Sequence, residues 1–197
     1  MIKAILFDVG GVLIWDDAVE ILKGQSRLLR IPYRELRDDM RVHRVLLMKG
    51  LITRREYLRR LAQRFKLPPI RVGDLQHLFP RYRYFRRNWA VARRLRRNGY
   101  CVGAITNVTP PFPFGQRLRL SPHFRPIIRS WQVKSVKPER RIFEIARRRA
   151  GFQFSEIALV DDRLRNVRAA RSLGIKAFVY KNPGELVRQL RRFGVRI

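Results

Sequence analysis

Five short apolar runs along the chain predict the strands of a single β-sheet. They cover residues Ile2–Phe7, Cys101–Ile105, Pro126–Arg129, Ile157–Val160 and Ile175–Tyr180. Each is short enough for a strand, and polar or glycine-containing segments separate it from the next apolar pattern. The sequence therefore predicts a sheet whose first strand begins close to residue 1 and whose other strands lie in the second half of the chain.

Amphipathic helical patterns separate most of these runs. Apolar positions at helical spacing predict a helix that begins at Pro138 and ends at Gly151, with proline and glycine at their preferred ends. Two further helices are predicted by Leu164, Val167 and Ala170, before Gly174, and by Trp89, Ala92 and Leu95, before Asn98 and Gly99. Strands that alternate with helices favour an α/β fold, a Rossmann-like parallel sheet with helices on both faces, whose ligands bind beyond the carboxyl ends of the strands.

The 70 residues from 16 to 85 have a helical pattern throughout. Leu36, Met40, His43 and Leu47 form one stripe, and Tyr57, Leu61 and Phe65 form another. Thr53 and Glu56 have the spacing of a capping box at the start of the second helix. Because the segment contains no convincing strand, we interpret it as a helical insertion (residues 16–85) in an α/β core made of residues 1–15 and 86–197.

Composition is compatible with one catalytic domain plus this insertion. The chain has 197 residues, 46% of them hydrophobic, which is enough for a sizeable core. No window is apolar enough for a membrane span, and strand-like sequence begins at Ile2, so we expect a cytoplasmic protein without a signal peptide. The single cysteine, Cys101, cannot form an internal disulfide or a cysteine metal cluster, and we expect it in the buried core of its strand.

Net charge is the second unusual property. The chain has 45 basic and 15 acidic residues, a net charge of +30, and most of the basic residues are arginine. A GC-rich genome would explain arginine in place of lysine, but not the scarcity of Asp and Glu. So positive a surface attracts phosphorylated substrates and polyanions alike, and charge alone does not distinguish them.

Polar groups follow the predicted strands at their carboxyl ends. Asp8 comes after the first strand, Thr106 and Asn107 after the second, and Asp161 with Asp162 after the fourth, while Lys137 precedes the Pro138 helix. The set contains a nucleophilic carboxylate, a hydroxyl, an ammonium group and a carboxylate pair that can hold a hard cation. Those groups are typical of a Mg²⁺-assisted phosphoryl-transfer site.

With these residues in order, the chain resembles the haloacid dehalogenase-like (HAD) phosphohydrolases over nearly its whole length. The four segments that carry the resemblance are Phe7–Leu13, Ile105–Asn107, Val136–Pro138, and Val160–Asp162 followed by Asn166. Lys49–Thr53 also resembles a recurrent segment of the family's helical cap. The resemblance implies that residues 16–85 are a C1-type cap that closes over the active site.

The resemblance also implies a mechanism. Asp8 would attack phosphorus and form an aspartyl-phosphate that water hydrolyses, while Thr106, the Asn107 amide and Lys137 hold the phosphoryl oxygens. Mg²⁺ would be bound by Asp8, the main-chain carbonyl of Gly10 and Asp162, with Asp161 in direct or indirect contact. Asn166 would orient the metal-binding loop.

Position 10 departs from the common pattern of the family. Much of the family has an aspartate there as general acid and base, whereas this chain has Gly10, as part of the family does. Loss of a general acid typically costs a factor of about 10²–10⁴ in rate. We therefore expect a restricted or slow phosphatase that favours aryl, acyl or anomeric phosphates, whose leaving groups need little protonation.

Several alternatives are less favoured by the sequence. Asp8 alone would be read as a turn residue, and Asp161 with Asp162 as a helix cap. Lys137 is distinguished from Lys134 only by its spacing and by Pro138. A metal-free dehalogenase has no use for the aspartate pair, and a phosphomutase needs the acid that Gly10 lacks.

The remaining signals concern binding. His43, His77 and His123 have no metal-ligand spacing; we interpret His43 as a packed or half-buried residue and His123 as structural or exposed. Residues 81–89 interleave arginines with aromatic residues, as single-strand nucleic-acid binders do, but Trp89 continues a helical apolar stripe, so packing is favoured. Arginine pairs and triplets on several predicted helices leave an alternative function open: a catalytically weak or inactive HAD-like protein that binds RNA or another polyanion through its basic surface.

Overall fold

A five-stranded parallel sheet forms the centre of the molecule. The computed structural model describes residues 1–15, 18–71, 73–75, 83–110, 120 and 123–197. The strands are β1 (Ala4–Phe7), β4 (Cys101–Thr106), β5 (Ile127–Arg129), β6 (Ile157–Asp161) and β7 (Lys176–Val179). Their order is β5-β4-β1-β6-β7, and β1 is in register with β4 and β6 on either side, as Ala4 pairs with both Cys101 and Ile157. The predicted α/β fold is confirmed, and each predicted apolar run contains a strand.

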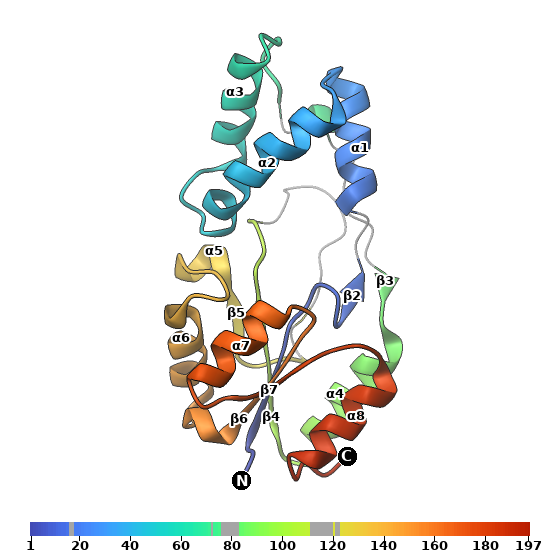
Figure 1. Ribbon diagram of the computed structural model, residues 1–197, viewed down its shortest axis with the longest axis vertical. Coiled ribbons are helices and arrows are strands. Elements are labelled where there is room, and N and C mark those ends of the chain that lie inside the picture. The colour runs from blue at the N-terminus through green and yellow to red at the C-terminus, as the bar shows by residue number, and fades with distance from the viewer. Residues whose placement is uncertain (16–17, 72, 76–82, 111–119, 121–122) are drawn as a thin grey trace.

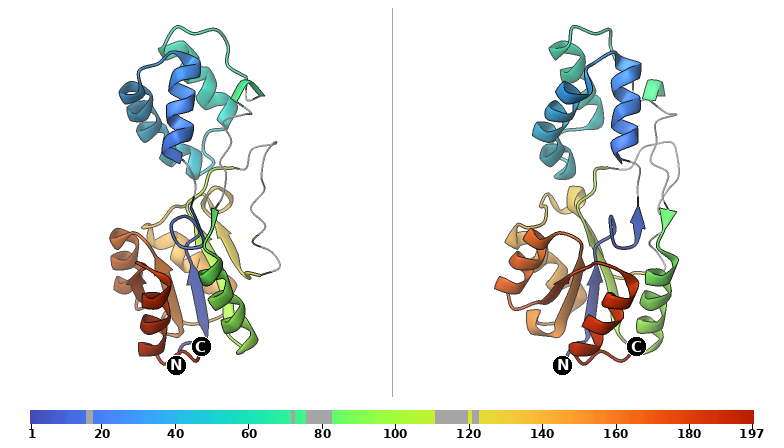
Figure 2. Two further views of the ribbon diagram at one scale, coloured as in Figure 1. Left: turned by 90° about the vertical axis from the view of Figure 1, so that its right-hand side faces the viewer. Right: turned by 45° about the vertical axis from the view of Figure 1, so that its right-hand side comes forward.

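Helices cover both faces of this sheet. One face packs against α4 (Arg86–Arg97) and α8 (Pro183–Arg192) through a core that includes Phe7, Trp89 and Leu95. The other face packs against α5 (Ser130–Val133), α6 (Arg140–Ala150) and α7 (Leu164–Ser172) through Leu6 and Phe143. Figure 2 shows the two helical layers on opposite sides of the strands. The sheet is therefore buried on both faces.

Two predicted helix features are corrected. The helix α6 begins at Arg140 rather than Pro138, because the amide of Glu139 donates to the Val136 carbonyl and closes a turn before the helix. Its predicted end is right, since Gly151 adopts φ +79° as the C-cap. The single turn of α5 was not predicted, because four residues are too short to show a helical period.

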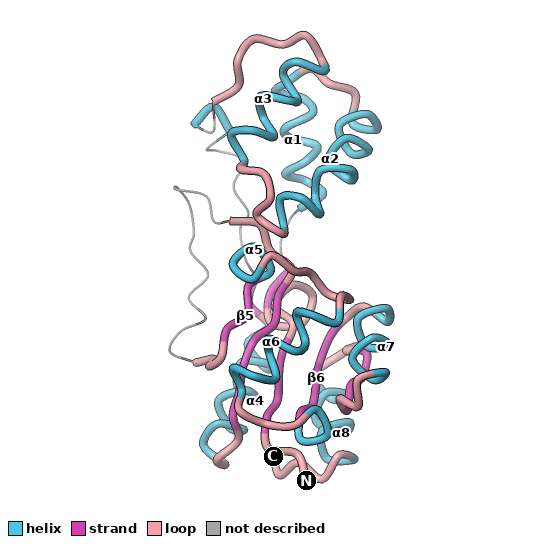
Figure 3. The backbone as a smooth tube through the Cα atoms, turned by 90° about the vertical axis from the view of Figure 1, so that its left-hand side faces the viewer, coloured by secondary structure: helices cyan, strands magenta, loops and turns pink. Residues whose placement is uncertain are grey.

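Three helices form a layer of their own beyond the carboxyl ends of the strands (Figures 1 and 3). They are α1 (Ala18–Leu29), α2 (Tyr33–Met48) and α3 (Arg54–Arg64). A separate apolar cluster, with Leu36, Leu47, Tyr57 and Leu61 at its centre, packs them together. The capping box at the start of α3 is confirmed: Thr53 and Glu56 exchange side-chain to backbone hydrogen bonds. We propose that this layer is the cap, with the boundaries 16–85 predicted above.

The expectation that the insertion has no strand is wrong at its edge. The strands β2 (Ile14–Trp15) and β3 (Arg83–Tyr84) form a two-stranded antiparallel ribbon where the chain leaves and re-enters the core. Strands of two residues have no readable period, and only the tertiary fold brings them together. His77, Arg81 and Tyr82 lie outside the described residues.

Cys101 is only partly buried, contrary to the prediction. It is the first residue of β4, and its thiol donates a weak hydrogen bond to the Arg125 carbonyl at 3.4 Å. A strand that begins at the edge of the core leaves its first side chain half-exposed.

None of the helices in the described part of the chain is long and apolar enough to cross a membrane.

Candidate active site

Asp8 lies immediately beyond β1, the central strand, and is 7% exposed. Its main-chain amide donates to the Val160 carbonyl of β6, which extends the sheet by one bond. One carboxylate oxygen, Oδ1, accepts the amide of Val9 at 2.6 Å and lies 3.0 Å from Lys137 Nζ. These contacts hold the carboxylate at the carboxyl edge of the sheet, where a parallel α/β fold binds its ligands.

Asp161 ends β6, the strand beside β1, and its side chain is completely buried. Oδ1 accepts hydrogen bonds from the Arg163 amide and Asn166 Nδ2, both at 2.9 Å, and Oδ2 accepts Asn166 Nδ2 at 3.1 Å and Lys137 Nζ at 2.6 Å. Asn166, in the first turn of α7, thus orients Asp161. Both Asp161 oxygens have protein donors, and this carboxylate serves to hold its neighbours in place.

Lys137 joins the two strand ends. The side chain comes from the loop between α5 and α6, is 2% exposed, and forms ion pairs with both Asp8 and Asp161. The Asn107 side chain fixes the lysine's backbone: its Oδ1 accepts the Lys137 amide and its Nδ2 donates to the Lys137 carbonyl, each at 2.8 Å. The sequence pointed to the Asn107 main-chain amide, and the structure adds this positioning role for its side chain.

Three carboxylates meet at this edge. Ligand atoms of Asp8, Asp161 and Asp162 lie within 4.8 Å of one another. Unlike the other two, Asp162 is exposed to solvent. Three carboxylates and one ammonium group leave two negative charges at this edge, and such a set of oxygen donors suits a divalent cation.

Electrostatics explain why the cluster needs such a cation. Burial raises the pKa of Asp8 to about 7, and Asp161 adds to the shift while Lys137 opposes it. Burial raises the pKa of Asp162 as well, with a further contribution from Asp161. Burial alone would lower the pKa of Lys137, but Asp8 and Asp161 together raise it. The Lys137 ammonium group therefore stays charged, whereas burial disfavours the ionised forms of Asp8 and Asp162.

The loop after Asp8 has two glycines with different constraints. Gly11 adopts φ +77°, and a Cβ there would lie 2.6 Å from Asp162 Oδ2, so only glycine lets the loop approach this carboxylate. At Gly10 a Cβ would meet nothing within 4 Å. Asn88 and Trp89 of α4 hold the far end of the loop by donating to the Val12 and Leu13 carbonyls. The Gly10-Gly11 pair was the only sequence signal for this close approach.

Thr106 and Ser130 complete the strand ends. Thr106 is the last residue of β4, next to β1, and is 7% exposed. Ser130, which the sequence did not single out, is buried, and its hydroxyl accepts from the Val108 amide and donates to the Val108 carbonyl, both at 3.0 Å. These two hydrogen bonds attach the loop after Thr106 to the start of α5.

The loop between α2 and α3 and the first residue of α3 contact the core. Lys49 Nζ lies 2.6 Å from Glu139 Oε1, and Lys134 Nζ donates to the Gly50 carbonyl at 2.6 Å. Arg54 donates to Thr109 Oγ1 and to the Pro110 carbonyl at 3.1 and 3.2 Å. Lys134, the alternative to Lys137, thus holds the proposed cap instead of a carboxylate.

Two histidines lie in packed surroundings. His43 Nδ1 is 3.0 Å from the Asp39 carbonyl, and its ring packs against Tyr57. His123 packs edge-on against Trp89, with ring centroids 5.7 Å apart. Both contacts agree with the structural role that the sequence favoured.

Solved structures share this fold. A HAD family enzyme of Bacteroides thetaiotaomicron, in a magnesium complex, has a TM-score of 0.75 at 23% identity, over 91% of this chain and 93% of that one. A predicted HAD-like family hydrolase of Porphyromonas gingivalis has a TM-score of 0.79 at 20% identity, over all of both chains. A 2-haloacid dehalogenase of Pseudomonas syringae has a TM-score of 0.70 at 18% identity, over 98% of this chain and 100% of that one.

In sequence, no curated protein matches the chain. A family model does, over residues 2–174, which include the whole acidic cluster and Lys137. The chain therefore belongs to the haloacid dehalogenase-like hydrolases.

Proposed function

We propose that the protein is a Mg²⁺-dependent phosphatase that hydrolyses a small phosphorylated metabolite through an aspartyl-phosphate on Asp8. The observation that carries this proposal is the meeting of three carboxylates with one buried lysine at the carboxyl edge of the sheet. The HAD family enzyme of Bacteroides thetaiotaomicron has been crystallised with magnesium and inorganic phosphate, which supports the same chemistry here.

Asp8 would act as the nucleophile. One of its oxygens, Oδ1, is engaged by the Val9 amide and Lys137, which leaves the second oxygen to attack phosphorus. Attack forms an acyl phosphate on Asp8 and releases the alcohol, and water then cleaves the acyl phosphate to regenerate the carboxylate. Lys137, Thr106 and the Asn107 amide would bind the phosphoryl oxygens as negative charge develops on them.

The donor set fits magnesium. Asp8, Asp162 and the Gly10 carbonyl would hold the ion, while Asp161, whose two oxygens already accept protein hydrogen bonds, would orient Lys137 from beside it. When bound, the ion would offset the negative charge of the carboxylates and the phosphoryl group together. Asp162 needs the close approach that Gly11 allows, so the glycine pair belongs to the proposed metal site.

Gly10 limits which esters the enzyme would hydrolyse well. A leaving group that needs no proton, such as a phenolate, a carboxylate or an anomeric oxygen, departs without a general acid. An alkyl alcohol does not. We therefore propose that aryl, acyl or anomeric phosphates are better substrates than simple alkyl phosphates.

The dehalogenase reaction is the alternative within the family, and one of the similar folds is a 2-haloacid dehalogenase. Displacement of a halide by a carboxylate requires no divalent cation. Two unbalanced negative charges around Asp8 favour the phosphatase over this alternative.

The test is Mg²⁺-dependent phosphate release from a panel of aryl, acyl, anomeric and alkyl phosphates, next to halide release from 2-haloacids. Asp8→Asn keeps the size of the side chain and removes the nucleophile, so phosphate release should fall to background while the melting temperature is retained. Phosphate release that survives Asp8→Asn would rule out Asp8 as the nucleophile. Halide release that persists in the presence of a chelator would favour the dehalogenase reaction.

A further inference from the structure

The longest part of the chain without a negative charge surrounds α4. Residues 75–138 contain no Asp or Glu in 64 positions, but 14 Lys or Arg. Six of these lie on α4 itself: Arg86, Arg87, Arg93, Arg94, Arg96 and Arg97. All six are exposed. The proposed phosphatase needs a basic residue at its carboxylates, but not a dense positive field on a helix that packs against one face of the sheet.

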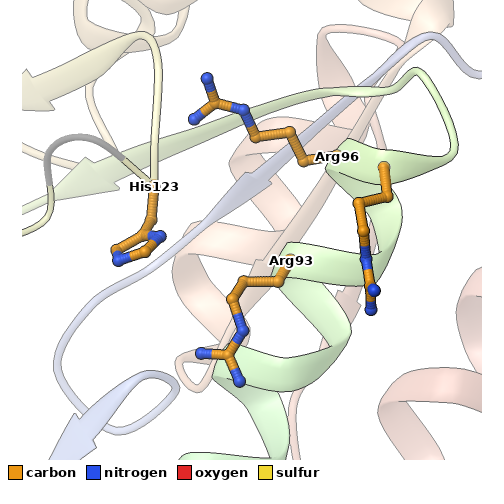
Figure 4. Close-up of a pocket in the computed structure, with 4 residues that line it drawn as sticks. Arg93, Arg96 and His123 are labelled. Carbon is orange, nitrogen blue, oxygen red and sulfur yellow. The ribbon is translucent and has the colours of Figure 1, made fainter.

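The surface along α4 is hollowed. A cavity of about 630 Å³ is lined by Arg93, Arg96, Arg97 and His123, and Figure 4 shows the α4 side chains and the imidazole around this space. A second cavity, of about 450 Å³, is lined by Tyr84, Arg86, Trp89, Arg93 and His123. Because the two share Arg93 and His123, they adjoin each other, and we call them together the α4 groove.

Three arginines of α4 form a row along this groove. Arg86, Arg93 and Arg97 are seven and four positions apart and therefore lie on one face of the helix. At 1.5 Å per residue they span about 16 Å along the helix axis. A row of guanidinium groups of this length fits an extended ligand with several anionic groups better than a single phosphate.

Aromatic rings form the floor between the arginines. Trp89 is 7% exposed, and its ring packs edge-on against Tyr84 at 5.6 Å and His123 at 5.7 Å. Tyr84 itself is 39% exposed. The packing that the sequence favoured for Trp89 thus supports two rings that border the groove and can stack with a planar group.

We propose that the α4 groove binds single-stranded RNA, with Arg86, Arg93 and Arg97 at the phosphates and unpaired bases against Tyr84 and His123. Basic grooves with aromatic platforms bind single strands because every base has a face that can stack. A duplex hides those faces, so the aromatic floor favours a single strand. The groove uses none of Asp8, Lys137, Asp161 or Asp162, and the proposal is independent of the proposed phosphatase.

Fluorescence anisotropy of a labelled twelve-residue oligouridylate tests this site. Arg93→Gln with Arg97→Gln should weaken binding at least tenfold and reduce the slope of log K against log salt by about 1.4, since each single-strand phosphate contact contributes about 0.7. The matched control is Arg59→Gln with Arg60→Gln, two exposed arginines of α3, which removes the same charge elsewhere. Equal losses in both pairs would overturn the proposal, because they would indicate attraction by net charge alone.

Tyr84 separates stacking from charge. Tyr84→Leu should weaken oligouridylate binding about tenfold without a change in the salt slope, whereas Tyr84→Phe should bind like the wild type. Polyglutamate that competes as well as RNA at equal charge would overturn the proposal in favour of an acidic protein partner. A duplex of the same length that binds as tightly would overturn the single-strand assignment. In each groove variant, phosphate release should be unchanged.

Discussion

At the scale of single residues, Gly10 and Gly11 are neighbours with opposite tolerance for a side chain. A Cβ at Gly10 meets no atom within 4 Å, whereas at Gly11 it would lie 2.6 Å from Asp162 Oδ2 on a backbone with φ +77°. The fold therefore leaves room for a Cβ at position 10, and steric exclusion does not explain why this chain has glycine there.

Gly10→Asp should raise the rate on alkyl phosphates by about 10- to 100-fold, because the new carboxyl can protonate the leaving alcohol. The rate on aryl phosphates should change little. Steady-state kinetics on an alkyl and an aryl ester measure the two effects side by side.

Gly11→Asp is the matched control for that substitution. It adds the same side chain one residue later, where strain and the clash with Asp162 should abolish activity and lower the affinity for Mg²⁺. An equal rise on both classes of ester in Gly10→Asp would contradict the role of leaving-group protonation.

The buried charge of Asp8 predicts how the stability of the metal-free protein depends on pH. Burial raises the pKa of Asp8 in the folded protein to about 7 from its ordinary value of 3.8, so between these values the folded state binds more protons than the unfolded state. The free energy of unfolding should therefore fall as the pH rises from about 4 to about 7. Urea unfolding in the presence of a chelator measures this slope.

Asp8→Asn supplies the reference for that measurement, because it removes the titrating group and keeps the size. Its slope between pH 4 and 7 should be smaller than that of the wild type. Identical slopes would assign the pH dependence to other groups.

At the scale of elements, the turn before Lys137 is shared between the core and the proposed cap. The Glu139 carboxylate accepts from Ser135 Oγ at 2.9 Å and from the Val136 amide at 3.3 Å, and its other oxygen pairs with Lys49. These bonds lower the pKa of Glu139 despite its burial, so the carboxylate stays charged at neutral pH. One side chain thus connects the α2–α3 loop to the segment that carries Lys137.

Glu139→Ala should lower kcat/KM about tenfold or more, because it releases both the turn before Lys137 and the contact with the α2–α3 loop. Lys49→Ala removes the second contact alone and should cost only a few-fold. The ratio of the two losses, from kinetics on one aryl phosphate, tests the division of roles. A larger loss in Lys49→Ala would show that the contact with the proposed cap is the more important one.

At the scale of the whole molecule, the net charge of +30 lowers the stability of the folded state through repulsion between like charges. Like charges on a compact surface repel one another more than on an unfolded chain. At about 0.01 M salt the Debye length is about 30 Å, and at about 0.1 M it is about 10 Å, so salt screens most of this repulsion.

The melting temperature should therefore rise steeply as NaCl increases from about 0.01 to 0.1 M and level off above about 0.2 M. Differential scanning calorimetry gives the curve. A melting temperature that is constant below 0.1 M would show that repulsion does not limit stability, and a linear rise to 1 M would indicate a general salt effect on burial.

The sequence was enough to predict which polar residues follow the strands of the sheet. A buried parallel strand is a continuous apolar run, so the predicted runs Ile2–Phe7 and Ile157–Val160 located β1 and β6, and the polar residues at their ends had to meet at one edge of the sheet. For the same reason the sequence placed Asp8 next to Asp161 and Asp162 without any knowledge of distances.

Contacts between distant segments were decided only by the tertiary structure. The two bonds from Asn107 to the Lys137 backbone, the β2–β3 ribbon and the contact of Lys49 with Glu139 each join residues that no local pattern relates.

The sequence by itself thus determined which side chains end the strands and how much positive charge the surface carries. Tertiary packing decided that Gly11 admits Asp162, that Gly10 has room for a side chain, and that arginines of α4 line one groove together with His123. The physical reason is that strand and helix formation depends on local periodicity, whereas a cavity or a close approach depends on where two separate elements meet.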